Sequence, residues 1–341
     1  MRSNKSSINW IDVDKIIKSF DRIMLTTHEN PDGDGLGSEV AMYHHLIENN
    51  KDVKIINCSS INEMYSFLNL DDCIEHYNNS IHSEWIKSVD LVIVFDVGDF
   101  SRTREIKDII INNKIRTMNI DHHPQPENHP FTFNYVDISS AATGCLVYDY
   151  LKTVSATSLN KNICTGIYTA VMTDTGCFKH SNTDVKSHVI ASECISHGVN
   201  TNKIFQIIYE NSSKERINLL GELIKSLKYE LDGKLAWFSI SKEMMKKTNA
   251  KNSDVEGFSD FIRGIAGVEV ALMINEQSYD YCRINFRSKG NIIVNTIAKS
   301  FGGGGHAFAA GAMVNGSKKE VEERVVKEAK SSLNKQLMTK K

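Results

Sequence analysis

The chain has 341 residues, of which 41% are hydrophobic and 24% are charged, and its formal net charge at pH 7 is -2. This length exceeds that of most single domains, so we expect two domains, and the composition is typical of a soluble globular protein. The balanced charge argues against a strongly basic body that binds nucleic acid non-specifically, although a local basic groove stays compatible with it.

Residues 1–20 contain no apolar run long enough for a signal peptide, and no later segment approaches membrane-spanning length. We therefore expect a cytoplasmic protein. Seven cysteines are scattered along the chain without a Cys-x-x-Cys pair, which predicts reduced thiols in or near the core. The sequence leaves the oligomeric state open, a homodimer included.

From residue 20 to about residue 200, short β-branched runs alternate with amphipathic stretches, a pattern typical of βαβ units in a parallel sheet. We expect strands at residues 22–27, 53–58, 90–96, 115–121 and 131–136. Between them, segments such as 36–50 and 140–154 carry apolar residues at helical spacing and should form helices that flank the sheet. Ligands of such sheets bind beyond the carboxyl ends of the strands.

Residues 201–231 have a helical pattern with no obvious strand and predict a helical connector. After this segment, strand-like runs at 234–241, 268–276 and 279–288 precede a helix-like segment at 319–337. They predict a smaller α/β domain with a mixed sheet. We therefore divide the chain into a domain of residues 1–200, a helical linker of residues 201–231 and a domain of residues 232–341.

The segment Thr27–Ser38, THENPDGDGLGS, places two aspartates in a short glycine-rich stretch after the first expected strand. In an extended segment, Asp32 and Asp34 project to the same side, where a cation would relieve their repulsion. As an alternative, one of these aspartates caps a helix that begins near Leu36. In the cation interpretation, three glycines permit tight turns: Gly33, Gly35 and Gly37.

Three further clusters carry acidic or histidine side chains: Asp96 and Asp99, then Asp121, His122 and His123, then Asp174. Each cluster alone is commonly explained by turn, cap or core residues. Three of the four clusters follow expected strands, however, and should therefore meet at one edge of the sheet. Carboxylates with a few imidazoles favour Mn²⁺ or Mg²⁺, with Co²⁺ as a substitute. Two such ions can activate a bridging hydroxide for in-line attack on phosphorus, and Asp96 is the candidate bridge between them.

In chain order, the motifs HENPDGDGLGS, FDVGD, IDHH and TDTG resemble the four motifs of the DHH phosphoesterase superfamily. The segment FGGGGHAFAAG, residues 301–311, resembles the glycine-rich signature of the DHH-associated C-terminal domain. Length and domain layout are similar to those of the nanoRNase/oligoribonuclease subfamily, called NrnA-like, which also dephosphorylates 3'-phosphoadenosine 5'-phosphate. The resemblance thus implies a catalytic, metal-binding domain followed by a substrate-binding domain.

The resemblance also implies a role for individual residues. One cation is bound by His28, Asp32 and Asp96, and the other by Asp34, Asp96, His122 and Asp174. His123 contacts the scissile phosphate or the nucleophile, Asp121 orients an imidazole, and Arg102 helps to hold a phosphate. The catalytic residues implied in this way are Asp96 and His123.

The glycine-rich segment in the second domain is ambiguous by itself. It fits a G-x-G-x-x-A dinucleotide pattern, but no Rossmann unit follows it, so we expect a loop whose backbone N–H groups approach an anion, with a flexible linker as the alternative. Arg283 and Arg287 lie four residues apart on an expected strand and face the same side, and guanidinium groups suit phosphate. The expected substrate-binding residues are Arg102, Arg283, Arg287, Gly303, Gly304, Gly305 and His306.

The residues predict a cytoplasmic, Mn²⁺-dependent phosphohydrolase. The resemblance implies that it degrades short oligoribonucleotides to nucleoside monophosphates, with 3'-phosphoadenosine 5'-phosphate as a further substrate. The same site would serve a cyclic- or linear-dinucleotide phosphodiesterase, an exopolyphosphatase or a pyrophosphatase. From a different class, a catalytically silent nucleotide- or RNA-binding regulator is disfavoured, because an inactive relative should have lost some of the implied metal ligands.

Overall fold

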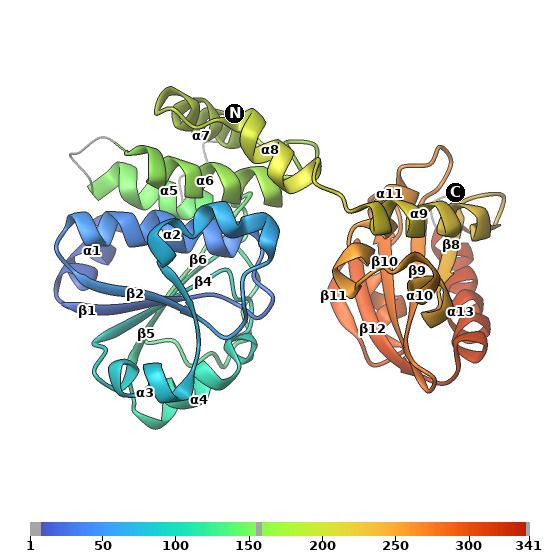
Figure 1. The fold of residues 1–341 in the computed structure, drawn as a ribbon, viewed down its shortest axis with the longest axis horizontal. Coiled ribbons are helices and arrows are strands. Elements are labelled where there is room, and N and C mark those ends of the chain that lie inside the picture. Colours follow the sequence, from blue (N-terminus) through green and yellow to red (C-terminus); the bar gives the residue numbers. More distant parts are fainter. Residues whose placement is uncertain (1–7, 155–158, 339–341) are drawn as a thin grey trace. The chain divides into compact units, whose positions relative to one another are not determined.

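The computed structural model describes residues 8–154 and 159–338, and the chain divides into two compact units, residues 1–211 and 212–341. Each unit has its own sheet (Figure 1). The boundary falls inside the expected helical linker, because α8 (Thr201–Tyr209) belongs to the first unit and α9 (Lys214–Ser226) to the second. The same segment also contains a short strand, β7 (Lys228–Glu230), where we expected helix alone.

The first unit is built on a six-stranded sheet with the order β3-β2-β1-β4-β5-β6, in which every pairing is parallel. The expected strands are present as β1 (Arg22–Thr26), β2 (Asp52–Asn57), β4 (Leu91–Phe95), β5 (Arg116–Asp121) and β6 (Phe133–Val136). The edge strand β3 (Ile74–His76) was missed, because three residues are too few to show a period. The predicted parallel α/β fold is confirmed.

Helices cover both faces of this sheet, as Figure 1 shows. Along β1, Ile23 and Leu25 pack on one side of the sheet into the larger core, while Met24 packs on the other side into a second core. The larger core contains α1 (Trp10–Lys18), α2 (Gly33–Glu48), α5 (Thr143–Val154), α6 (Lys161–Asp174) and α7 (Val185–Ser196). The second core contains α3 (Asn79–Lys87) and α4 (Glu105–Asn112). Short 3-10 helices span Glu63–Leu68, Leu70–Asp72 and Phe100–Thr103.

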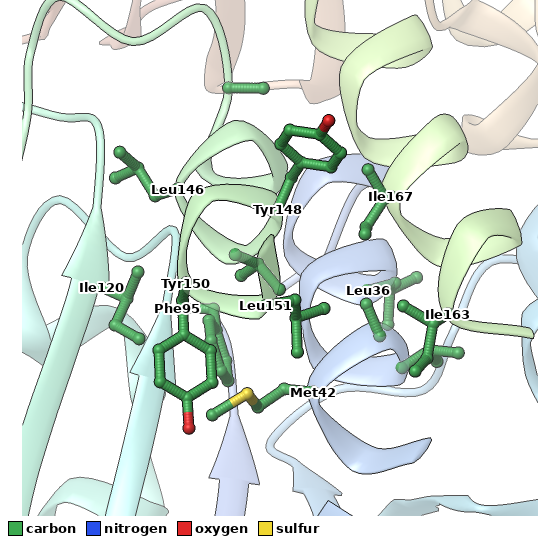
Figure 2. Close-up of a cluster of buried hydrophobic side chains, with 14 of the residues drawn as sticks. Leu36, Met42, Phe95, Ile120, Leu146, Tyr148, Tyr150, Leu151, Ile163 and Ile167 are labelled. Atoms are coloured by element: carbon green, nitrogen blue, oxygen red, sulfur yellow. The ribbon is translucent and has the colours of Figure 1, made fainter. Parts of the chain in front are cut away.

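Figure 2 shows part of the larger core, in which apolar side chains of α2, α5 and α6 pack together with those of the sheet. Leu36 of α2, Leu146 of α5 and Phe95 of β4 are completely buried there. This packing fixes the three helices against the sheet. Asp34 lies in the first turn of α2, and Asp174 is the last residue of α6. The first turn of α5 contacts Asp34 and Asp96.

Helices α2 and α6 approach each other so closely that only glycine fits at their contact. A Cβ atom on Gly37 would lie 2.3 Å from the carbonyl oxygen of Gly166, and a Cβ atom on Gly166 would lie 2.5 Å from that of Gly37. Real Cβ atoms essentially never come under 3.0 Å, so a larger residue would push the helices apart. The close approach sets the separation between α2, which carries Asp34, and α6, which ends at Asp174.

The glycines of the first motif therefore act differently from our expectation. We predicted tight turns before a helix that begins near Leu36, but α2 begins at Gly33. Gly33, Gly35 and Gly37 are all helical, and none has a positive φ angle. A Cβ atom on Gly33 would lie 2.6 Å from the hydroxyl oxygen of Thr173 in α6. These glycines are needed for close packing around the helix, not for a turn.

The second unit contains a six-stranded sheet with the order β11-β12-β10-β9-β8-β7. Only β8 and β9 pair in parallel, so the sheet is mixed, as predicted. Its strands after β7 are β8 (Leu235–Ile240), β9 (Val270–Ser278), β10 (Tyr281–Ser288), β11 (Gly304–His306) and β12 (Ala309–Asn315). Its helices after α9 are α10 (Lys242–Thr248), α11 (Phe258–Arg263), α12 (Asn295–Lys299) and α13 (Lys318–Met338), with a 3-10 turn at Asn252–Val255.

The glycine-rich segment of this unit forms part of the sheet, which corrects the expectation of a loop. Residues Gly304–His306 form β11 and pair with β12 in antiparallel orientation. A Cβ atom on Gly303 would lie 2.2 Å from the carbonyl oxygen of Gly311, and Gly305 has a φ angle of 127°, which other residues rarely adopt. The glycines thus permit a tight hairpin and a strained backbone. Among the residues that the structure describes, no helix combines the length and apolar character needed to cross a membrane.

Candidate metal centre

Three loops of the first unit meet at the carboxyl edge of its parallel sheet. The chain leaves β1 toward β2 on one side and later returns to β4 on the other, so β1 and β4 flank a topological switch point, where such sheets open a crevice. His28 follows β1, Asp96 follows β4 and His122 follows β5. Asp174 reaches the same place from the last residue of α6. The four sequence clusters, far apart along the chain, therefore converge.

The first group of side chains consists of His28, Asp32 and Asp96. The Nε2 atom of His28 lies 3.8 Å from Oδ2 of Asp32 and 3.7 Å from Oδ2 of Asp96. Asp32 is also the N-cap of α2, where its Oδ1 atom accepts hydrogen bonds from the backbone N–H groups of Asp34 and Gly35. One oxygen of Asp32 thus caps the helix while the other faces His28, so the cap leaves the second oxygen available to a cation.

The second group is centred on His122. Its Nε2 atom lies 3.7 Å from Oδ2 of Asp34, 3.5 Å from Oδ1 of Asp96 and 3.9 Å from Oδ2 of Asp174. Asp96 therefore presents one carboxylate oxygen to each group. The backbone of Asp96 is left-handed, with a φ angle of 56°, a conformation that costs free energy in any residue other than glycine. The fold maintains this conformation at the residue that both groups share.

Both groups have the chemistry of a divalent-cation site. Ligands about 2.1 Å from one ion are about 3 to 4 Å apart at ordinary coordination angles, and the distances from each histidine nitrogen to its carboxylate oxygens lie in this range. The Nε2 atom of His122 is buried without a hydrogen-bond partner, a condition that costs about 1–3 kcal/mol unless another group satisfies the atom. The ligand atoms are oxygen and imidazole nitrogen, without thiolate, which suits Mn²⁺, Mg²⁺ or Co²⁺ better than structural zinc. The residues present therefore fit two such ions.

The carboxylates of the centre repel one another. Burial raises the pKa of Asp34 well above its usual range, and the charges of Asp96 and Asp174 raise it further. Burial likewise raises the pKa of Asp174 to about 6. For Asp96, burial also favours the neutral form, but the close imidazoles of His122 and His123 outweigh it and hold the pKa far below the usual value. Positive charge is therefore needed to keep this group of acids ionised together.

Asp121 fixes the orientation of His123. Its Oδ1 atom accepts a hydrogen bond from the backbone N–H of His123 and lies 2.9 Å from the Nδ1 atom of the same residue. Its Oδ2 atom accepts hydrogen bonds from Gly98 and Gln125. Burial lowers the pKa of His123, but the carboxylates of Asp121 and Asp96 outweigh burial and raise that pKa to about 11. Without bound cations, the imidazole of His123 is consequently positively charged.

Arg102 lies beside the first group. Its Nη2 atom is 3.0 Å from Nδ1 of His28, which is also 2.7 Å from the carbonyl oxygen of Glu29. A carbonyl oxygen only accepts hydrogen bonds and a guanidinium only donates them, so Nδ1 cannot satisfy both partners at once. If a cation binds Nε2 of His28, the ring proton must be on Nδ1. The Nδ1–H group then donates a hydrogen bond to the carbonyl oxygen of Glu29. The guanidinium of Arg102 would then be available for an anion.

Two neighbouring residues that the sequence analysis missed contact the carboxylates of the two groups. The backbone N–H groups of Thr143 and Gly144, at the start of α5, donate to the two oxygens of Asp34 at 2.7 and 2.8 Å. The hydroxyl of Thr143 donates to Oδ1 of Asp96 at 3.0 Å. Helix α5 follows β6, so its start belongs to the same edge of the sheet. The strand-exit argument could have found it, but we followed only acidic and histidine side chains.

A buried glutamate supports the loop that carries His28. Oε2 of Glu39 in α2 accepts a hydrogen bond from Asn57, whose side-chain oxygen accepts one from the backbone N–H of Thr27. The hydroxyl of Thr27 donates to the carbonyl oxygen of Phe95, the residue before Asp96. Burial raises the pKa of Glu39 to about 8, although the hydrogen bond from Asn57 acts in the opposite direction.

In the second unit, most of the expected substrate-binding residues line one pocket of about 520 Å³. Arg283 and Arg287 alternate with buried residues along β10 and share a face with Asn285, which also lines the pocket and was missed. Gly303, Gly304 and Gly305 complete it, whereas His306 is exposed and does not line it. Arg287 is held by Asp260, with 3.3 Å between Nε and Oδ2, while Arg283 is exposed.

Known proteins resemble both units. The N-terminal domain of the DHH family matches residues 22–173, and the DHHA1 domain matches residues 232–335. A Mycoplasma genitalium protein named bifunctional oligoribonuclease and PAP phosphatase NrnA is 28% identical over 323 residues, which is 91% of this chain and 93% of that protein. The Bacillus subtilis protein of the same name is 28% identical over 303 residues, or 88% of this chain and 91% of that protein. An exopolyphosphatase-related protein from Bacteroides fragilis has a similar structure, with a TM-score of 0.90 and 27% identity over 99% of this chain and all of that one.

The raised pKa of Glu39 predicts a pH dependence of stability. The usual pKa of a glutamate is 4.5 and that of Glu39 in the folded protein is about 8, so the folded state holds an extra proton between these values. The contribution of this proton to the free energy of unfolding is fully present below pH 4.5 and is lost as pH rises through about 8. Between these values the free energy of unfolding falls by about 1.4 kcal/mol per pH unit. We expect Glu39→Gln, which keeps an oxygen for Asn57, to be more stable than the wild type at pH 8.5.

Urea unfolding at pH 5, 7 and 8.5 measures this difference. The control is Glu48→Gln, at the exposed end of the same helix, which should follow the wild type at each pH. If the Glu39→Gln and wild-type free energies of unfolding ran parallel across the three pH values, Glu39 would not hold the extra proton.

Proposed function

The chain belongs to the DHH superfamily of metal-dependent phosphoesterases and is similar over most of its length to proteins named NrnA, and from this premise we propose that it degrades short oligoribonucleotides to nucleoside monophosphates. We include 3'-phosphoadenosine 5'-phosphate among its substrates. Two divalent cations assist the reaction, and Mn²⁺ is the first choice for them.

The observation that carries this proposal is the position of Asp96. Its two carboxylate oxygens face two separate groups of oxygen and imidazole ligands, at 3.7 Å from His28 and 3.5 Å from His122. In the proposed assignment, His28, Asp32 and Asp96 hold one cation, and Asp34, Asp96, His122 and Asp174 hold the other. Such a pair of ions would supply a hydroxide nucleophile at neutral pH, by lowering the pKa of bound water, and would neutralise charge on the phosphoryl group.

The residues around these groups bind and orient the phosphate. His123 is held by Asp121 with Nδ1 toward the carboxylates, and its positive charge stabilises negative charge that develops on the phosphoryl oxygens. Arg102 supplies a second positive group once the proton on Nδ1 of His28 is committed to Glu29. A planar guanidinium suits phosphate because it donates two parallel hydrogen bonds.

The pocket of the second unit binds a part of the substrate that is not cut. Its volume of about 520 Å³ lies within the range of about 300–1,000 Å³ that small-molecule sites occupy. The exposed guanidinium of Arg283 suits a phosphate of the chain, and the backbone of Gly303, Gly304 and Gly305 has no side chain to keep a nucleotide away.

Replacing Asp96 tests the function most simply. We expect Asp96→Ala to slow the Mn²⁺-dependent hydrolysis of a labelled RNA dinucleotide at least about 100-fold, as is typical when a group that stabilises developing charge is removed. Circular dichroism should show an intact fold. The matched control is Asp99→Asn, three residues away, because Asp99 is exposed and belongs to neither group of ligands. A wild-type rate for Asp96→Ala would contradict the proposal.

A side-by-side rate comparison defines the substrate. It uses the wild-type protein in Mn²⁺ with an RNA dinucleotide, an RNA pentanucleotide, 3'-phosphoadenosine 5'-phosphate, cyclic di-AMP and pyrophosphate. We expect the short RNAs to be hydrolysed fastest. A clear preference for cyclic di-AMP or pyrophosphate would replace the proposed substrate while leaving the phosphoesterase chemistry in place.

Replacing Arg283 tests the role of the second unit. A hydrogen bond to a charged group contributes about 1.5–3 kcal/mol, so we expect Arg283→Ala to raise KM for the RNA dinucleotide about 10- to 100-fold. Hydrolysis of bis-nitrophenyl phosphate, which offers only the scissile phosphate, should stay unchanged. Arg324→Ala, an exposed arginine of the same unit outside the pocket, is the control. An equal effect on both substrates would contradict a role for Arg283 in binding the uncut part.

A further inference from the structure

The start of helix α5 contacts two carboxylates. The two groups share that of Asp96, whereas that of Asp34 belongs to the second group alone. Asp34 receives a backbone hydrogen bond on each oxygen, at 2.7 Å from the N–H of Thr143 and at 2.8 Å from that of Gly144. The side chain of Thr143 donates its hydroxyl proton to Oδ1 of Asp96 at 3.0 Å. One residue therefore orients two carboxylates from different elements, α2 and the end of β4.

The backbone contacts keep Asp34 in one orientation. Its carboxylate is buried, and a buried charge is tolerated only where hydrogen bonds compensate for lost water. The two N–H groups at the start of α5 have no partners within their own helix, and the helix dipole favours negative charge at this end. With both oxygens bonded, the plane of the Asp34 carboxylate is fixed, and Oδ2 is directed toward His122 at 3.7 Å.

The hydroxyl contact keeps Asp96 in one orientation. Oδ1 of Asp96 lies 3.5 Å from Nε2 of His122 and 3.3 Å from Nδ1 of His123, so the contact with Thr143 at 3.0 Å is the shortest of the three. Nε2 of His122 would turn to a cation when one binds. The hydroxyl of Thr143 can keep its hydrogen bond then, because a carboxylate oxygen accepts at more than one lone pair.

An ordinary structural role does not account for this hydroxyl. A threonine at the start of a helix usually accepts a hydrogen bond from the helix's own backbone. Thr143 instead donates outward, to the one carboxylate that both groups share. The side chain is completely buried, so a valine of nearly the same shape would preserve the packing and remove only the hydrogen bond.

We propose that Thr143 is a positioning residue, which sets the affinity of the second group of ligands for its cation by holding Oδ1 of Asp96 toward that group. The inference rests on the proposed function, because it concerns the same centre. Thr143 does not touch the reacting phosphate and acts only through Asp96 and Asp34.

The test is Mn²⁺ binding to the whole protein, followed by isothermal titration calorimetry, for Thr143→Val and Thr143→Ser. Removing a group that hydrogen-bonds a metal ligand typically weakens binding about 10- to 100-fold. We expect Thr143→Val to weaken the second Mn²⁺ by this factor and to leave the first nearly unchanged. Thr143→Ser keeps the hydroxyl and should restore wild-type affinity. The control is Thr169→Val in α6, which is equally buried but whose hydroxyl donates to the backbone of its own helix.

Three results would be decisive. Wild-type affinity for both Mn²⁺ ions in Thr143→Val, or equal weakening in Thr169→Val, would overturn the role of Thr143 and leave the proposed function standing. Failure of the wild type itself to bind two Mn²⁺ ions and to hydrolyse RNA would instead overturn the proposed function. If Thr143→Val did not fold, Thr143→Ala would take its place, with the same weakening expected and a wild-type affinity again counting against the proposal.

Discussion

Two buried carboxylates at the end of one parallel sheet impose the constraint on which the first unit depends. Asp34 and Asp96 are almost inaccessible to solvent, and the charge of Asp96 raises the pKa of both Asp34 and Asp174. Buried charge is costly unless hydrogen bonds or opposite charges compensate for it. Backbone N–H groups of α5, two histidines and the proposed cations provide this compensation. The N–H groups and the histidines come from different parts of the chain, so the charge can be accommodated only in the folded unit.

The packing of the first unit maintains the distances that this compensation requires. The contact between Gly37 and Gly166 leaves no room for a Cβ atom and so sets the separation of α2 and α6, the helices of Asp34 and Asp174. The hydrogen bonds from Glu39 through Asn57 hold the loop before His28. Packing and polar contacts therefore both act on the side chains that we propose as cation ligands. Rigid elements that converge on one point are what a two-cation site needs, because its ligands must be within a few tenths of an ångström of their ideal places.

Much of this arrangement could be predicted from local sequence. Apolar runs marked the strands of the parallel sheet, and Asp96 and His122 were found because they follow such runs. Features that depend on tertiary contact could not be predicted. The three-residue strand β3 has no detectable period. Gly33 was assigned to a turn because the approach of α6 leaves no sign in neighbouring residues. Thr143 carries no charge, so its contact with Asp96 became visible only when β4 and α5 were placed together.

The central claim is that Asp96 bridges two cations, and anomalous diffraction from crystals grown with Mn²⁺ tests it most directly. The account predicts two anomalous peaks about 3.5–4 Å apart, as in other two-metal sites. One should lie between His28, Asp32 and Asp96, and the other between Asp34, Asp96 and His122. A single peak, or two peaks without Asp96 between them, would contradict the account.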